Sequence, residues 1–349
     1  MYSTRYLAAF AMVATITPLA SAAPKKNAPK TATKTAQPKL IREVMGTTQL
    51  SGYEGKLGQT FTLGKDSPLN FTLNRLEYSV GRVNIGNYAH HPLGDEKMLI
   101  LHFTVQNPTK RVTNFSASYL TFNAIDANGV TRNYLGDIAR EVTAEPVQIA
   151  LNPGQKIEAY TAIKVAAFGP VPKIIVRHAY ETKAPILRYD GRGAAKKLTA
   201  PFGDPADQSG TTALKMVPVK SGTWYQVTDF FDAKLEKVDY ATKIAEREAG
   251  TGKKYCVATF SIRNGGKRPT NYGQSFFRAD LKDADGEKTD YNTSMLKGSR
   301  DEEASSTLAP GEEARVRFYW TLPENVDAQT VLLQYGYNRE ARTFAFPAK

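Results

Sequence analysis

Residues 107–115 read NPTKRVTNF, and residues 264–272 read NGGKRPTNY. The two stretches share the first Asn, the Lys-Arg pair and the Thr-Asn pair, and each ends in an aromatic residue. Each follows a segment of alternating apolar residues, which is typical of a strand with one buried face. These apolar residues are Leu99, Leu101, Phe103 and Val105 in the first segment and Cys256, Ala258, Phe260 and Ile262 in the second. The pattern predicts a strand and the turn after it, present twice.

The repeat extends outward from this motif. A shift of 157 positions aligns residues 97–180 with residues 254–337 without a gap, and it places DANG on DADG and LNPG on LAPG. Upstream, FTLNRLE at 71–77 aligns with FFDAKLE at 230–236 by a shift of 159, which predicts a two-residue difference in the intervening loop. Self-similarity at a fixed spacing indicates a duplicated unit. We therefore expect one domain built twice.

Each copy contains several short predicted strands separated by turn sequences. Almost no helical periodicity occurs, although VDYATKIAEREAG at 238–250 could hold one helical turn. Such a pattern is typical of an antiparallel β-sandwich. We predict sandwich 1 over 45–192, a linker rich in Gly, Pro and charge over 193–220, and sandwich 2 over 221–349.

The order of these motifs resembles the immunoglobulin-like domain of secreted bacterial antigens and lipoproteins, the immunoprotective extracellular-protein type. The residues that carry the resemblance are Phe103, Asn107, Ser118, Tyr119, Asp126, Gly129, Leu151, Pro153 and Gly154, with their partners 157 positions later. The resemblance implies an all-β chain with two tandem antiparallel immunoglobulin-like sandwiches. It implies no catalytic residues, because that family has no agreed ones. Many members carry a lipid on an N-terminal cysteine, and this chain has none there.

The N-terminal sequence predicts export. Arg5 precedes an apolar stretch of signal-peptide length, and Ala20-Ser21-Ala22 fits the small-residue cleavage rule. We expect a signal peptide over 1–22, cleavage after Ala22, and a secreted or periplasmic mature chain. No later apolar run reaches the ~20 residues that a spanning helix needs, so no transmembrane segment is expected in the mature chain.

Residues 23–44 are predicted to form a disordered basic arm rich in Lys, Pro, Ala and Thr. Its cations are Lys25, Lys26, Lys30, Lys34, Lys39 and Arg42. Of the formal net charge of +12, Arg5 supplies one unit and the arm six, which leaves +5 from residue 43 onward. The rest of the chain is therefore only weakly basic, and nucleic acid is not an expected partner. A protein or an anionic cell-envelope polymer is expected instead, and the arm could also be a plain spacer.

The Lys-Arg pairs of the repeated motif are the candidate ligand-binding residues. Lys110 and Arg111 occupy the same predicted loop of the first copy as Lys267 and Arg268 do of the second. Two adjacent cations on an exposed loop can meet an anion, although the same loop could simply be solvated. The shared asparagines, Asn107 and Asn264, are predicted to cap the strand end.

His90 and His91 are the candidate metal ligands, since imidazole binds zinc or copper. The second copy has no histidine there, and we expect a solvated polar loop rather than a metal site. DANG and DADG lack the third acid and the final Glu of a calcium loop and are predicted to be hairpin turns. No cofactor is expected.

Nothing in the sequence identifies a nucleophile. Cys256 falls on the predicted core face, and no G-x-S-x-G elbow occurs. The aromatic residues could line a glycan-binding face, but most alternate inward or recur at closing positions such as Tyr134 and Tyr180, so we assign them to core and turns.

The sequence therefore predicts an exported, non-enzymatic protein whose two duplicated domains bind a protein or a cell-envelope component. Two alternatives stay open. One is a hydrolase of cell wall or polysaccharide with unidentified acidic residues. The other is a periplasmic carrier of a metal or small ligand that uses His90 and His91.

Overall fold

The computed structural model describes residues 55–181, 183–244, 246–289, 294–336 and 340–349. The predicted signal peptide and basic arm lie outside these residues. The described residues belong to one compact unit. They form strands throughout, with two short 3-10 helices, η1 (Ala117–Tyr119) and η2 (Gln274–Phe276). No helix among them is long and apolar enough to cross a membrane.

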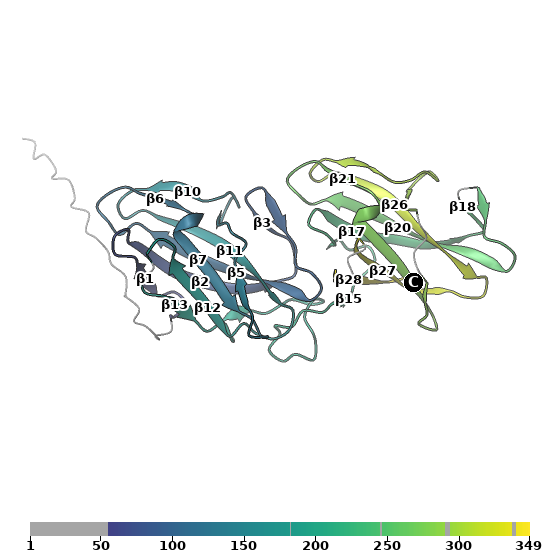
Figure 1. The fold of residues 1–349 in the computed structure, drawn as a ribbon. Coiled ribbons are helices and arrows are strands. Elements are labelled where there is room, and N and C mark those ends of the chain that lie inside the picture. Colours follow the sequence, from purple (N-terminus) through teal and green to yellow (C-terminus); the bar gives the residue numbers. More distant parts are fainter. Residues whose placement is uncertain (1–54, 182, 245, 290–293, 337–339) are drawn as a thin grey trace, which may run out of the picture. The chain divides into compact units, whose positions relative to one another are not determined.

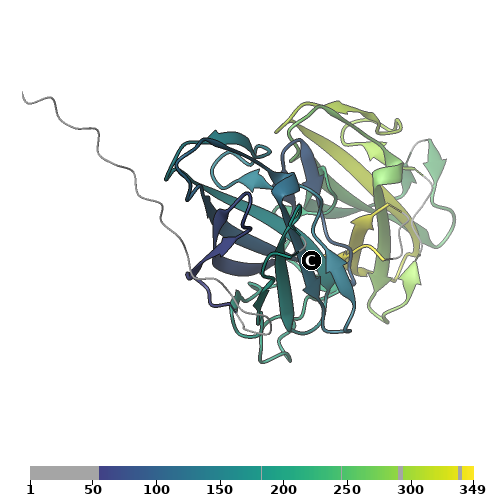
Figure 2. The same ribbon diagram turned by 60° about the vertical axis from the view of Figure 1, so that its left-hand side comes forward.

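The first sandwich consists of two facing sheets (Figures 1 and 2). One sheet has the order β1 (Thr60–Leu63), β2 (Leu69–Ser79), β5 (Glu96–Gln106), β11 (Lys156–Ala166) and β9 (Ala139–Arg140), with β14 (Ala195–Lys196) also on β2. The other has the order β13 (Leu187–Tyr189), β12 (Lys173–His178), β7 (Leu120–Ile125) and β8 (Thr131–Asn133). Two small ribbons complete it: β3 (Val83–Ile85) with β4 (Tyr88–His90), and β6 (Thr113–Ser116) with β10 (Gln148–Leu151).

The second sandwich repeats this arrangement, which confirms the predicted duplication. Its first sheet has the order β16 (Tyr225–Gln226), β17 (Phe231–Ala241), β20 (Lys253–Asn264), β26 (Glu313–Pro323) and β24 (Leu296–Lys297). Its second sheet has the order β15 (Met216–Pro218), β28 (Thr343–Pro347), β27 (Ala328–Tyr335), β22 (Phe277–Asp283) and β23 (Lys288–Thr289). The small ribbons are β21 (Thr270–Tyr272) with β25 (Ser306–Leu308), and β18 (Lys243–Ile244) with β19 (Arg247–Glu248).

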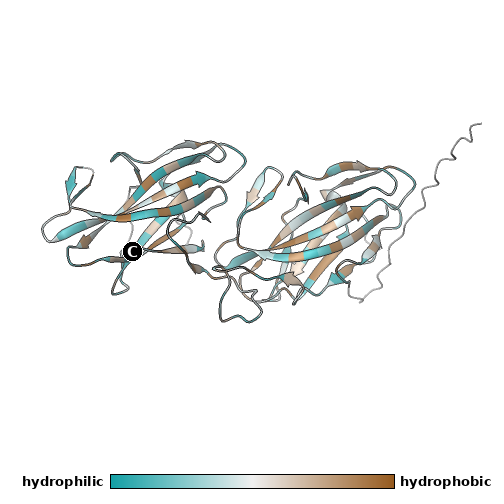
Figure 3. Cartoon of the chain, turned by 180° about the vertical axis from the view of Figure 1, so that it is seen from behind, coloured by the Kyte–Doolittle hydropathy of each residue, from teal (hydrophilic) through white to brown (hydrophobic). Residues whose placement is uncertain are grey.

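The cores lie between the two sheets of each sandwich, as the alternation of the sequence predicts. Figure 3 shows apolar and polar residues alternating along the long strands. The predicted inward residues of β5 and β20 are all buried, and Phe103 and Phe260 occupy the matching positions of the two cores. Cys256 is buried and unpaired, and burial raises the pKa of its thiol to about 12, so it is an inert core residue.

The register of β2 and β17 corrects one part of the predicted alignment. Leu73 pairs with Phe103, and Leu235 pairs with Phe260, so these strands match by a shift of 162 rather than 159. Both strands carry a bulge directly after that leucine. The connection to the next strand is therefore five residues shorter in the second copy, not two. A bulge kept in both copies is typical of a feature that sets strand twist.

The segment 238–250 also differs from expectation. Its predicted helical turn is wrong: β17 continues to Ala241, and β18 and β19 then form a tight hairpin. Ile244 from this hairpin packs with Tyr255, Val257 and Tyr319 on the outer face of the sheet. The β-ribbon thus adds a buried residue to this apolar cluster.

The two repeated asparagines brace the strand ends as predicted. The side-chain amide of Asn107 donates to the carbonyls of Arg111 (2.6 Å) and Leu151 (2.9 Å), and its oxygen accepts the N–H of Thr109 (2.9 Å). Asn264 is also fully buried and donates to the carbonyls of Arg268 (2.7 Å) and Leu308 (2.8 Å). Because buried backbone groups must be paired, each asparagine holds its loop in one conformation.

Buried cations join the two sandwiches and the linker. The Arg82 side chain is 4% exposed and contacts Asp232 (2.9 Å) and the carbonyls of Gly265 (3.1 Å) and Thr228 (3.2 Å). Arg342 donates to the carbonyls of Leu214 (2.9 Å) and Glu96 (2.8 Å). We call the region around Arg82 and Arg342 the joint.

Lys97 fixes the linker to the first sandwich. It is fully buried and donates to the carbonyls of Ala167, Gly169 and Thr211, and burial lowers its pKa to about 8. Two short strands of the predicted linker also pair in parallel, β14 with β2 and β15 with β28. The segment 193–220 is therefore folded against both sandwiches.

Candidate anion-binding site

Strand register places four loop segments at one end of the first sandwich. Asn70 at the start of β2 pairs with Gln106 at the end of β5, which pairs with Lys156 at the start of β11. The turn 64–68, the loop 107–112 and the turn 152–156 therefore lie together. The segment around Glu181 joins them, because Glu181 accepts N–H groups of the first turn. We call residues 64–68, 107–112, 152–156, 179–181 and 183–185 the outer end.

The outer end carries more cations than acids. Its five cationic side chains are exposed and make no ion pair with the described part of the chain; they are Lys65, Lys110, Arg111, Lys156 and Lys183. Its two acids are Asp66 and Glu181. Unpaired cations gathered on one surface raise the local concentration of anions. The surface can therefore hold an anionic polymer or headgroup.

The Glu181 carboxylate accepts three backbone N–H groups. One oxygen accepts the N–H of Lys65 (2.5 Å), and the other accepts those of Asp66 (3.1 Å) and Ser67 (2.9 Å). Partial burial alone would raise the pKa of Glu181, but these N–H groups hold it below the usual range. Gly64, with φ of +84°, permits this contact, since a Cβ there would lie 2.7 Å from a Glu181 oxygen. The turn and the segment 179–181 are thus fixed to each other.

The four predicted cations separate into two environments. Lys110 and Arg111 lie in the outer end beside exposed Val112. Lys267 and Arg268 are also exposed but lie at the joint, where they line a small cavity of about 40 Å³ with Asn84 and Phe230. The two copies of the loop therefore do not form one site.

The histidine pair is placed differently from expectation. His90 ends β4, and His91 is only 9% exposed, so the predicted solvated loop is wrong for His91. Burial, then Arg342 and Arg82, lower the pKa of His91 to about 3. Two nearby guanidinium groups repel a metal ion as they repel a proton. In the described residues no three His, Cys, Asp or Glu side chains are grouped to hold a metal.

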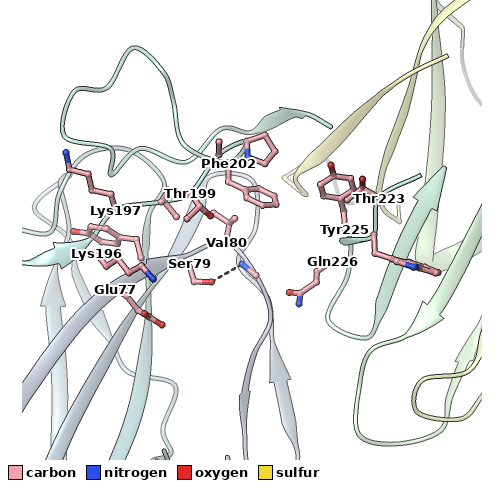
Figure 4. Close-up of a pocket in the computed structure, with 16 residues that line it drawn as sticks. Glu77, Ser79, Val80, Lys196, Lys197, Thr199, Phe202, Thr223, Tyr225 and Gln226 are labelled. Atoms are coloured by element: carbon pink, nitrogen blue, oxygen red, sulfur yellow. Dashed lines mark hydrogen bonds between the residues drawn. The ribbon is translucent and has the colours of Figure 1, made fainter. Parts of the chain in front are cut away.

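A second hollow of about 590 Å³ lies at the joint (Figure 4). Phe202 and Tyr225 contribute rings, and Lys196 and Lys197 come from the linker. Glu77 is the one acid among its lining residues, and it is held by Arg75 (3.1 Å) and lies 3.4 Å from His102. This hollow does not present two carboxylates across an open space.

Sequence reasoning found Lys110 and Arg111 and missed the other cations of the outer end. Lys65 and Lys156 each adjoin a turn sequence, GKDSP and NPGQ, and Lys183 follows a predicted strand. Their turns could be read from the sequence. That these cations lie close together could not be read from the sequence, because it depends on which strands pair.

A family model described as "Domain of unknown function (DUF4352)" matches residues 220–341, which span most of the second sandwich. No curated protein matches the chain significantly. An uncharacterized β-sandwich protein from Clostridium difficile is 19% identical with a TM-score of 0.29, and the match covers 38% of this chain and 93% of that one. The secreted protein MPT63 from Mycobacterium tuberculosis is 22% identical with a TM-score of 0.28, and the match covers 40% and 99%.

Proposed function

We propose that the protein is an exported, non-enzymatic binding protein whose outer end meets an anionic component of the cell envelope. The observation that carries this proposal is the set of five exposed cations at the outer end, none of which forms an ion pair with the described residues. The predicted signal sequence supports export, and the predicted basic arm would add a second cationic segment.

The pKa directions and ion pairs of the acidic residues favour a binding role over the hydrolase alternative. A two-carboxylate glycosidase needs one acid whose pKa is raised so that it can donate a proton. At the outer end the pKa of Glu181 is lowered instead. At the joint burial raises the pKa of Asp229, but Asp229 does not line the hollow there, whose one acid, Glu77, is engaged by Arg75.

Charge reversal in the full mature chain tests the proposal. The variant Lys110→Glu, Arg111→Glu, Lys156→Glu should elute from immobilised polygalacturonate at markedly lower salt than the unaltered protein. The matched control is Lys267→Glu, Arg268→Glu, Lys220→Glu, which carries the same charge change and leaves the outer end intact. The basic arm is present in both, so the difference reports the outer end.

Equal elution of the two variants would show that only net charge matters and would contradict the proposal. Far-UV circular dichroism and thermal melting should be unchanged for both variants, because surface substitutions cost no more than about 0.5 kcal/mol.

A further inference from the structure

Tyr180 does not have the core or turn role that its repeated position predicts. Its side chain is 65% exposed, although the strand before it ends in buried His178. The ring is nonetheless held in place. It meets Tyr119 edge-on at 5.4 Å between centroids and His178 at 6.3 Å. Tyr119 in turn meets His178 edge-on at 5.9 Å. Such edge-to-face contacts fix the orientation of a ring that solvent would otherwise leave mobile.

The fixed ring borders a hollow of about 650 Å³ at the outer end. Pro68 and Pro185 contribute apolar walls, and Lys65 and Lys183 contribute charge. A hollow of this volume is in the range that takes a small ligand of a few rings. Its lining combines one exposed aromatic face with two lysines that form no ion pair in the described residues and with two acids, Asp66 and Glu181.

The Glu181 contact makes this arrangement a single unit. Glu181 directly follows Tyr180 and accepts the N–H groups of Lys65, Asp66 and Ser67. The segment that carries Tyr180 is therefore joined to the Lys65 turn through Glu181. Because three N–H groups occupy the Glu181 carboxylate, it forms no ion pair with Lys65 or Lys183, and their ammonium groups stay available to an anion.

We propose that this hollow binds an acidic sugar, with the apolar face of a pyranose ring on Tyr180 and its acidic group on Lys65 and Lys183. An acidic sugar uses both features, because the C–H face of the sugar packs on the ring while the anion forms charge-assisted hydrogen bonds with ammonium groups. The inference rests on the proposed function and names its ligand class. A carboxylate and a phosphate offer the same chemistry to the lysines.

Binding of three oligosaccharides to the full mature chain tests the inference by titration calorimetry. The probes are oligogalacturonate, a phosphorylated mannan oligosaccharide and neutral dextran of similar length. We expect one or both acidic probes to bind and dextran to bind at least tenfold more weakly. The tighter acidic probe identifies the acid as carboxylate or phosphate.

Variants then separate the ring from the charges. Tyr180→Ala should weaken binding of the acidic probe about tenfold, and Tyr180→Trp should retain it. Lys65→Glu, Lys183→Glu should weaken it at least tenfold and flatten its salt dependence. The matched controls are Tyr88→Ala, which removes an equally exposed tyrosine (70%), and Lys196→Glu, Lys197→Glu; neither should alter binding.

Three outcomes would overturn the inference: no binding of either acidic probe, equal binding of dextran, or full affinity in Tyr180→Ala. If Tyr180→Ala binds normally while the Lys110, Arg111, Lys156 variant loses retention on polygalacturonate, the acidic-sugar site fails and the anion-binding role stands. If both variants behave like the unaltered protein, both proposals fail. Thermal melting of each variant checks that it is folded.

Discussion

The loops 107–112 and 264–269 have the same internal brace and different neighbours. In each, a fully buried asparagine spans the loop and holds a carbonyl four residues later and another on the facing turn. The first loop projects at the outer end, whereas the second receives the guanidinium of Arg82. Duplication therefore preserved the brace that the fold needs and left the exposed positions available for separate uses.

The sequence difference between the loops has a steric cause. Pro108 of the first loop corresponds to Gly265 of the second by the shift of 157. A Cβ at Gly265 would lie 2.3 Å from Nη1 of Arg82 and 2.9 Å from both carboxylate oxygens of Asp232. A side chain at 265 would therefore displace the buried guanidinium of Arg82 or the carboxylate of Asp232, which explains the glycine.

The largest expected effect is a loss of stability that the two loops should share, because both contain the bracing asparagine. Asn107→Ala and Asn264→Ala should each lower the free energy of unfolding by about 3 kcal/mol, because each leaves buried backbone groups without partners. Urea denaturation measures this. Asn123→Ala, at an exposed asparagine bonded to Asn133, is the control and should cost less than about 1 kcal/mol. A small cost at either braced position would mean that the brace is dispensable there.

A smaller loss of stability should distinguish the two loops. Gly265→Ala should cost about 1–3 kcal/mol, because the added methyl group displaces Arg82 from its buried site. Pro108→Ala should cost less than about 1 kcal/mol, chiefly through the greater freedom of the unfolded chain. In an Arg82→Ala background the Gly265→Ala cost should fall, which a double-mutant cycle measures. If Gly265→Ala destabilises the Arg82→Ala variant as much as it destabilises the unaltered protein, the contact with Arg82 is not the cause.

A further effect, specific to the joint, is a pH dependence of stability. His91 faces Arg342, Arg82, Lys164 and the Gln226 backbone, and the Asp229 carboxylate accepts a backbone N–H from it. Its folded pKa of about 3 lies below the unfolded value of 6.5, so the unfolded chain takes up a proton first as pH falls. The stability from neutral His91 is complete above pH 6.5 and is lost progressively toward pH 3.

Denaturation between pH 7 and pH 4.5 measures that slope. His91→Asn should flatten it, whereas Tyr88→Ala, on the same hairpin but exposed, should not. An unchanged slope in His91→Asn would assign the dependence to other groups.

Much of each sandwich could be predicted from the sequence, because strand alternation and turn residues are local signals. Phe103 and Phe260, the bracing asparagines and the Asp126 turn all lie where the pattern placed them. The β2 and β17 register could not be predicted, because a bulge changes the alternation without leaving a sequence mark.

The candidate site was predicted only in part, for a topological reason. Lys110 and Arg111 are adjacent in sequence, but Lys65, Lys156 and Lys183 join them only once β2, β5 and β11 are paired. The burial of His91 is likewise a property of the joint. Arg342 and the Gln226 backbone, which lie beside it, come from elements far along the chain.

Pro108 has a consequence for assembly. A joint of this kind is directional: an arginine on one sandwich enters a glycine-lined loop on the next, and a directional contact that repeats generates an open chain of molecules. Pro108 stands at the matching position of the first loop, so that loop carries a Cβ where the second loop has none. The first sandwich therefore lacks the glycine beside which Arg82 sits in the second, and the duplicated fold does not present this receiving loop twice.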